Sequence, residues 1–87
     1  MRDYCAEVLR IRFRRKLVST RTEMGISQAD MAVLLSMSLR SYADLERGKG
    51  CCGAVTLALF LVRVCPDPKG FLDELREAMD EAIVAFR

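Results

Sequence analysis

The sequence predicts an all-α fold, and three observations support this prediction. Apolar residues recur at helical spacing along most of the chain, and Ser and Gly residues stand where such helices would begin and end. The length of 87 residues, with 52% apolar residues, suits a single domain. Because aromatic residues make up only 7% and Trp is absent, we expect a core of Leu, Val, Met and Ala.

The first helical region covers residues 1–24. Residues 1–12 fit a helix, but the pattern leaves open whether they form a separate helix or extend the next one. In the segment 13–24 apolar and basic residues lie on different faces. The inward positions are Phe13, Leu17, Val18 and Met24, and the outward ones are Arg14, Arg15 and Lys16. Gly25 fits a left-handed cap at the C-terminal end.

Two short helices follow, joined by a tight turn at residues 36–38. Ser27 suits the N-cap of the first helix, and Asp30 completes a pair that resembles a capping box. Ser38 caps the second helix, which ends at Gly48. The residues expected to pack the two helices together are Ala32, Met37, Tyr42 and Leu45.

The rest of the chain predicts two further helices. The apolar run at residues 54–65 indicates a central buried helix, which is too short and too interrupted by Arg63 to span a bilayer. Residues 66–70 contain two Pro residues and break this helix. A last helix at residues 71–86 either packs on residues 54–65 or takes part in a dimer contact. Its apolar seam consists of Leu72, Leu75, Met79, Ala82 and Phe86.

The net charge of +2 conceals an asymmetry along the chain. Residues 1–25 carry a net charge of +4, residues 26–50 are neutral, and residues 51–87 carry −2. A basic front and an acidic back suit a protein that presents one face to a polyanion.

The four cysteines do not predict a metal site or a disulfide. Adjacent Cys51 and Cys52 cannot bridge without strain, and the chain has no His and no Cys-x-x-Cys pair. Cys65 is expected to be a buried apolar residue. Cys5 has no assigned role, and Cys51 and Cys52 fall in a Gly-rich loop where a redox response stays open. No signal peptide pattern precedes them, so we expect a cytoplasmic location.

The segment from Phe13 to about Leu61 resembles the helix-turn-helix domain of the phage Cro and C1 repressors and of the xenobiotic-response-element regulators of bacteria. The resemblance covers just over half the chain. The matching residues are Gly25-Ile26-Ser27-Gln28, Met31-Ala32, Leu35, Met37-Ser38, Tyr42 and Leu45-Glu46-Arg47-Gly48. Two positions depart from the family, which usually has Gly at Ser36 and Ile or Val at Tyr42.

The resemblance implies a compact five-helix bundle similar to the lambda repressor domain. Residues 13–65 would form the DNA-binding domain, and residues 1–12 would be an N-terminal extension. Residues 66–87 would be a C-terminal helix that packs on the domain or makes a dimer contact. The second short helix would be the recognition helix and would enter the major groove.

The resemblance also assigns individual roles. The residues expected to contact bases are Leu39, Arg40, Ser41 and Asp44. Asp44 is the least secure of them, because it can instead pair with Arg40 one helical turn earlier. Those expected to contact phosphates are Ser27, Gln28, Arg47 and Lys49. Arg21 and Glu46 are expected to form an ion pair that joins the first helix to the recognition helix.

We therefore expect a sequence-specific transcriptional regulator that binds double-stranded DNA, a repressor of phage, mobile-element or antitoxin type, acting as a homodimer on a two-fold operator. The alternative is a protein-interaction module on the same fold, which the neutral middle segment and Asp44 favour slightly. An enzyme is not expected, because the chain has no His, no Gly-rich phosphate loop and no nucleophile with an evident base. Neither a cofactor nor a metal is expected, nor is a membrane partner.

Overall fold

The computed structural model describes residues 2–50 and 53–85, and all regular structure within these two stretches is helical, which confirms the all-α prediction. The elements are α1 (Arg2–Met24), α2 (Gln28–Leu34), α3 (Leu39–Glu46), α4 (Ala54–Leu59), a short π-helix η1 (Phe60–Val64) and α5 (Pro68–Ala85). No helix in these stretches combines the length and the apolar character needed to cross a membrane.

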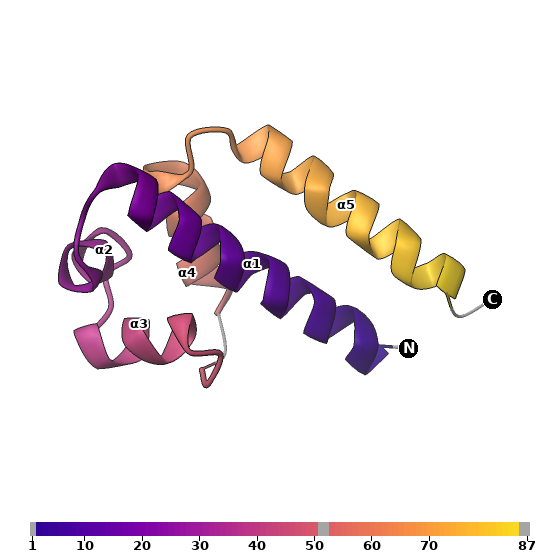
Figure 1. Ribbon diagram of the computed structural model, residues 1–87, viewed down its shortest axis with the longest axis horizontal. Coiled ribbons are helices and arrows are strands. Elements are labelled where there is room, and N and C mark those ends of the chain that lie inside the picture. The colour runs from indigo at the N-terminus through magenta and orange to yellow at the C-terminus, as the bar shows by residue number, and fades with distance from the viewer. Residues whose placement is uncertain (1, 51–52, 86–87) are drawn as a thin grey trace.

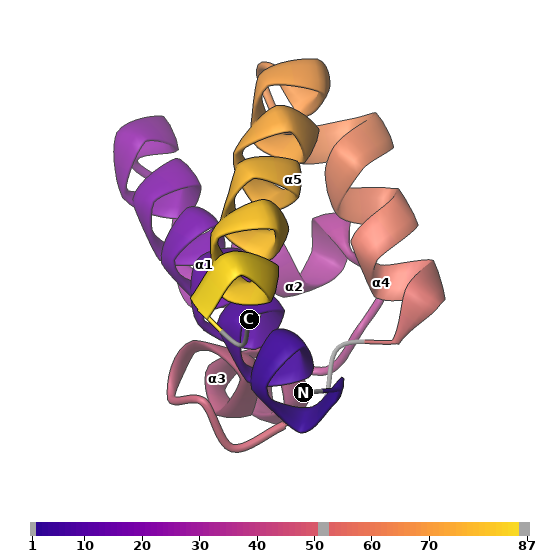
Figure 2. The same ribbon diagram turned by 90° about the vertical axis from the view of Figure 1, so that its right-hand side faces the viewer.

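Two long antiparallel helices set the shape of the molecule. α1 and α5 lie side by side and run in opposite directions, so the first turns of α1 and the last turns of α5 share one end (Figure 1). α2, α3 and α4 gather around the other half of α1 (Figures 1 and 2). α1 runs without a break over 23 residues. Residues 2–12 therefore extend the first helix and do not form a separate one.

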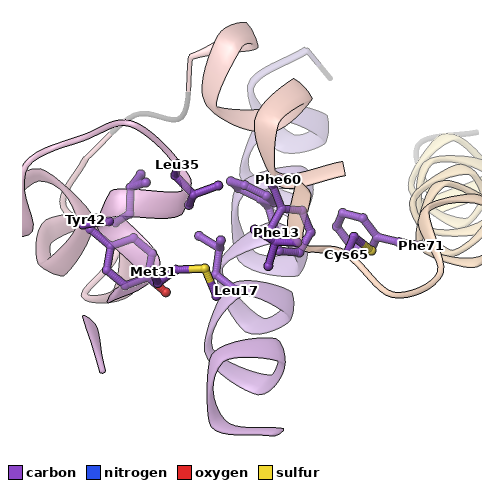
Figure 3. Packing of buried hydrophobic residues seen from close by; sticks show 11 residues of the cluster. Phe13, Leu17, Met31, Leu35, Tyr42, Phe60, Cys65 and Phe71 are labelled. Atoms are coloured by element: carbon purple, nitrogen blue, oxygen red, sulfur yellow. The ribbon is translucent and has the colours of Figure 1, made fainter. Parts of the chain in front are cut away.

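The core is more aromatic than the composition suggests. Phe13, Phe60 and Phe71 come from three elements. Phe60 meets the other two rings edge to face, with ring centroids 5.3 Å apart for Phe13 and 5.9 Å apart for Phe71, and the Phe13 and Phe71 rings are tilted at 33° with centroids 6.4 Å apart. Tyr42 is also fully buried. Figure 3 shows these rings in one layer with Leu17, Met31 and Leu35. Eight of the thirteen buried apolar residues in the described parts are Leu, Val, Met or Ala, as expected, but the core also contains four of the six aromatic residues of the chain.

The apolar run at residues 54–65 does not form a central buried helix. α4 has no fully buried residue, and Val55 and Val62 are 73% and 83% exposed. Phe60, Val64 and Cys65 are the buried residues of this segment, and Leu57, Leu59 and Leu61 pack against the core while only partly buried. In a domain this small a helix contacts the core with one face only, so the opposite face stays in solvent. The burial predicted for Cys65 is confirmed.

α5 begins at Pro68 and not at Phe71, so the second proline starts a helix instead of breaking one. Pro suits the first position of a helix because its missing N–H would have no partner there. Asp67 caps this helix, and its Oδ1 accepts a hydrogen bond from the Gly70 N–H at 3.1 Å. A Cβ on Gly70 would lie 2.1 Å from the other carboxylate oxygen of Asp67. A larger residue at position 70 would therefore displace the Asp67 carboxylate from its present position.

α5 packs mainly on α1. The sequence predicts residues 54–65 or a dimer contact as the partner of this helix. The fully buried residues of α5 are Phe71, Ala78 and Ala82, and Leu75 is partly buried against the core. Of the predicted seam, Leu72 is exposed, and Phe86 lies outside the described residues. The predicted seam therefore begins one residue too late, at Leu72, where the structure buries Phe71.

The first three helices end in the same backbone motif. In each, a residue with positive φ follows the C-cap, and two backwards hydrogen bonds close the last turn. These residues are Gly25 at +69°, Ser36 at +54° and Gly48 at +78°. After α2 the Ser36 N–H donates to the Val33 carbonyl and the Met37 N–H donates to the Ala32 carbonyl. Ser36 thus adopts the left-handed conformation that glycine adopts at the other two ends.

Replacing Ser36 by Gly should therefore maintain or raise stability. A left-handed residue with a Cβ costs about 1 to 2 kcal/mol, and the extra flexibility of glycine in the unfolded chain offsets about 0.5 to 1 kcal/mol of the gain. We expect Ser36→Gly to stabilise the fold by up to about 1 kcal/mol, and β-branched Ser36→Val to destabilise it by about 1 to 2 kcal/mol. Urea unfolding measures both. A less stable Ser36→Gly variant would contradict this account of the turn.

Candidate nucleic-acid interface

Local side-chain caps position α2 and α3. The Ser27 hydroxyl accepts a hydrogen bond from the Asp30 N–H at 3.1 Å, and Asp30 accepts one from the Ser27 N–H at 3.3 Å. The Ser38 hydroxyl accepts from the Ser41 N–H at 3.1 Å. Both predicted N-caps are confirmed. They satisfy backbone donors that would otherwise lack partners at the start of each short helix.

The predicted packing residues lie where α2 meets α3. Ala32, Tyr42 and Leu45 are buried, and Met37 is partly buried against the same core. The small side chain of Ala32 lets the two helices approach closely. Tyr42 retains a polar group in this apolar environment, so its hydroxyl needs a hydrogen-bond partner.

That partner is Glu46, whose side chain is only 8% exposed. Its carboxylate accepts hydrogen bonds from Arg21 Nε at 2.7 Å and Arg21 Nη2 at 3.1 Å, from the Tyr42 hydroxyl at 2.5 Å, and from Gln28 Nε2 at 2.9 Å. We call these four side chains the Glu46 network. It joins α1, α2 and α3 through one buried carboxylate, and it confirms the expected contact of Arg21 with Glu46.

Arg21 extends the network to the backbone. Its Nη1 donates a hydrogen bond to the Ile26 carbonyl at 3.1 Å, in the turn between α1 and α2. The planar guanidinium thus binds a carboxylate with one edge and a turn carbonyl with the other, which suits its fixed fork of donors. The link from Gln28 to Glu46 has no signal in the spacing of the sequence. The link from Tyr42 does, since the two residues stand one turn apart on one helix.

The network sets the charge states of its members. Burial by itself would raise the pKa of Glu46, but the hydrogen bonds from Arg21, Tyr42 and Gln28 outweigh burial and lower the pKa below its usual value. Burial, reinforced by the hydrogen bond to the carboxylate, raises the pKa of the Tyr42 phenol. The hydrogen bond to Glu46 raises the pKa of Arg21. At neutral pH the network therefore holds an ion pair and a neutral phenol.

The residues expected to contact bases lie on the outer side of α3. Leu39, Arg40 and Ser41 are exposed in its first turn, and Asp44 is partly exposed one turn later. Tyr42 and Leu45 face the core on the opposite side. The structure therefore brings the four candidates together on one accessible surface.

Asp44 does not pair with Arg40. It forms an ion pair with Arg47, three residues further along the chain. The Arg40 side chain makes no hydrogen bond or ion pair within residues 2–50 and 53–85. Asp44 has Arg40 one turn before it and Arg47 one turn after it, and sequence spacing does not decide which of the two pairs with it.

The phosphate-contact candidates occupy two places, the start of α2 and the segment after α3. Ser27 is engaged in its cap, and Gln28 donates one amide N–H to Glu46 and retains a second. Arg47 and Lys49 are exposed, with Arg47 held by Asp44. Gln28 and Arg47 thus have internal partners that were not expected.

In the parts of the chain that the structure describes, no three His, Cys, Asp or Glu side chains converge to hold a metal ion. Cys51 and Cys52, for which a redox response was left open, lie outside these parts.

The chain was compared with protein-family models, with curated proteins and with solved structures. It matches none of them.

Removing the charge of Glu46 should destabilise the fold in a pH-dependent way. Because the folded pKa is lowered, the ionised carboxylate contributes stability above its unfolded pKa, and this contribution is lost as pH falls through the folded value. We expect Glu46→Gln to cost about 2 to 4 kcal/mol at pH 7. The difference from the unmodified protein should shrink below the usual glutamate pKa of about 4.3.

Urea unfolding at several pH values measures this effect. The matched control is Glu77→Gln, which removes an exposed carboxylate on α5 and should change stability by less than about 0.5 kcal/mol. Equal effects of the two substitutions at neutral pH would show that the Glu46 network does not stabilise the fold.

Proposed function

We propose that this protein is a sequence-specific DNA-binding transcriptional regulator that inserts α3 into the major groove. The proposal rests mainly on the exposure of the Arg40 side chain and on its lack of a partner among the described residues. Its side chain is exposed at the start of α3 and has no partner in the described parts of the chain. A guanidinium in this position is free to bind the two acceptors on a guanine edge. The proposal includes action as a repressor and a cytoplasmic location.

The neighbours of Arg40 suit the same surface. Leu39 is 52% exposed and offers an apolar contact for a thymine methyl group, and the Ser41 hydroxyl offers a polar one. Asp44 orients Arg47 through their ion pair, which turns a flexible cation into a directed one. Ser27 and Gln28 at the start of α2 and Lys49 after α3 supply contacts to the phosphate backbone on either side.

Rigidity strengthens the proposal. The Glu46 network and the buried rings hold α3 from behind, so its outer face needs little ordering on binding. Pre-organised surfaces lose less conformational entropy when they associate, which leaves more of the contact energy for discrimination between sequences.

A protein-interaction module is the second candidate. The Asp44–Arg47 pair leaves the second turn of α3 without net charge, and Val33 on α2 is 75% exposed. Both features suit a protein surface better than a polyanion. Salt dependence separates the two candidates, because binding through phosphates weakens steeply as salt rises.

Arg40→Ala should reduce sequence discrimination. Selection from a random duplex pool should enrich an inverted repeat with the unmodified protein, and the variant should bind this repeat about tenfold to hundredfold more weakly. Arg76→Ala is the matched control, since it removes an exposed arginine from α5 and should leave affinity nearly unchanged. Recovery of all sequences equally by both proteins would contradict the proposal of a specific reader.

The proposal also includes a homodimer, because two half-sites multiply the affinity of a small reader. We place the contact on the exposed apolar side chains of α5, which are Leu72, Ile83 and Val84. Sedimentation should show a concentration-dependent dimer. Val84→Glu should weaken it at least about tenfold, since an unpaired carboxylate would be buried, while Val62→Glu on η1 should not. A chain that stays monomeric throughout would contradict the dimer.

A further inference from the structure

A cavity of about 240 Å³ lies between the middle of α1 and the end of α3. Its lining includes four apolar side chains, which are Ile11, Phe13, Leu17 and Leu45. Phe13, Leu17 and Leu45 belong to the buried core. Leu17 is fully buried, Phe13 and Leu45 are only 7% and 6% exposed, and Ile11 is partly exposed. The apolar surface that a ligand can reach in the cavity is therefore formed by Ile11 and the exposed edges of Phe13 and Leu45.

Charged side chains of one predominant sign complete the lining. Three arginines, Arg10, Arg14 and Arg47, contribute to it together with a single carboxylate, Glu7. Arg10 pairs with Glu7 at 3.4 Å, and Arg47 pairs with Asp44. Arg14 makes no ion pair or hydrogen bond with any residue that the structure describes. Within the described residues, Arg14 is thus the cation of the cavity that has no ion-pair partner.

Two glycines keep the cavity open. Gly48 has a φ of +78°, and a Cβ at this position would lie 3.7 Å from both Cδ and Nε of Arg14. The Arg14 side chain therefore extends over the Gly48 backbone. A Cβ on Gly50 would lie 3.6 Å from Leu45. Since neither glycine has a side chain, the segment after α3 does not fill the space between Arg14 and the apolar residues.

We propose that this cavity binds a small organic anion. The anionic group, a carboxylate or a phosphate, binds the unpaired guanidinium of Arg14, with Arg10 and Arg47 beside it. The apolar part of the ligand lies against Ile11 and the exposed edges of Phe13 and Leu45. The volume is smaller than the 300 Å³ or more of pockets for drug-sized ligands. A ligand with one ring and one charged group matches this size.

A phosphate of the DNA backbone has the same anionic chemistry, so the source of the anion must be distinguished. A backbone phosphate uses only the cations of the cavity and leaves its apolar lining unused. A free organic anion uses both. The combination of Arg14 with Ile11 and the exposed edges of Phe13 and Leu45 therefore favours the free molecule, and this argument does not depend on whether α3 reads DNA.

NMR titration of backbone amides tests the inference with phenyl phosphate as the probe. Saturable shifts should be centred on Ile11, Gly48 and Gly50. Phenol, which lacks the charge, and inorganic phosphate, which lacks the ring, should each bind at least about tenfold more weakly. A phenyl phosphate titration without saturable shifts at these amides would overturn the proposal, as would equal binding of phenyl phosphate and inorganic phosphate.

Variants show whether Arg14 is the cation concerned. Arg14→Gln should weaken phenyl phosphate binding about tenfold or more, and Arg14→Lys should retain part of it. Arg12→Gln is the matched control, because Arg12 is exposed on the same helix and is not among the residues that line the cavity. Equal losses in Arg14→Gln and Arg12→Gln would overturn the assignment.

A short DNA duplex is the last arm of the test. If the duplex shifts the cavity amides and phenyl phosphate does not, the site serves a backbone phosphate and the inference of a free organic anion is wrong. If phenyl phosphate binds and the duplex leaves these amides unchanged, the inference is supported whether or not the protein binds DNA elsewhere.

Discussion

The buried carboxylate of Glu46 is the interaction on which the arrangement of the first three helices depends. An ionised carboxylate removed from water is strongly unfavourable unless donors surround it, and here Arg21, Tyr42 and Gln28 supply them. Apolar packing has no preferred direction, whereas these hydrogen bonds require particular distances and angles. The network therefore selects one orientation of α1, α2 and α3 among those that the core alone would permit.

The contacts among Phe13, Phe60 and Phe71 position η1 and α5 against α1. Phe71 meets Phe13 and Phe60, and Lys16 lies over the Phe71 ring, with its Nζ 5.8 Å from the centroid. α1 takes part in both arrangements, since it carries Arg21 near one end and Phe13 and Lys16 in its middle. The long first helix thus serves as the common support for α3 on one side and α5 on another.

Local features of this fold could be predicted from the sequence, and contacts between distant residues could not. Ser27, Ser38, Gly25 and Gly48 act on their own backbone, so a few neighbouring residues suffice to predict the caps. The Arg21–Glu46 pair came from the resemblance and not from spacing. Asp44 had two cations within one turn, and the inward placement of the phenylalanines depends on the packed structure. Neither the composition nor the spacing of apolar residues predicts which cation pairs with Asp44 or which aromatic rings are buried.

The Glu46 network also has a dynamic consequence. Because one carboxylate holds α2, α3 and the last turns of α1, none of these elements can open without breaking hydrogen bonds to the others. Their amide protons therefore exchange with solvent through one shared opening. The first turns of α1, where residues 3–10 include no fully buried side chain, open separately and at lower free energy. Amide protons around α3 should therefore be better protected from exchange than those in the first turns of α1.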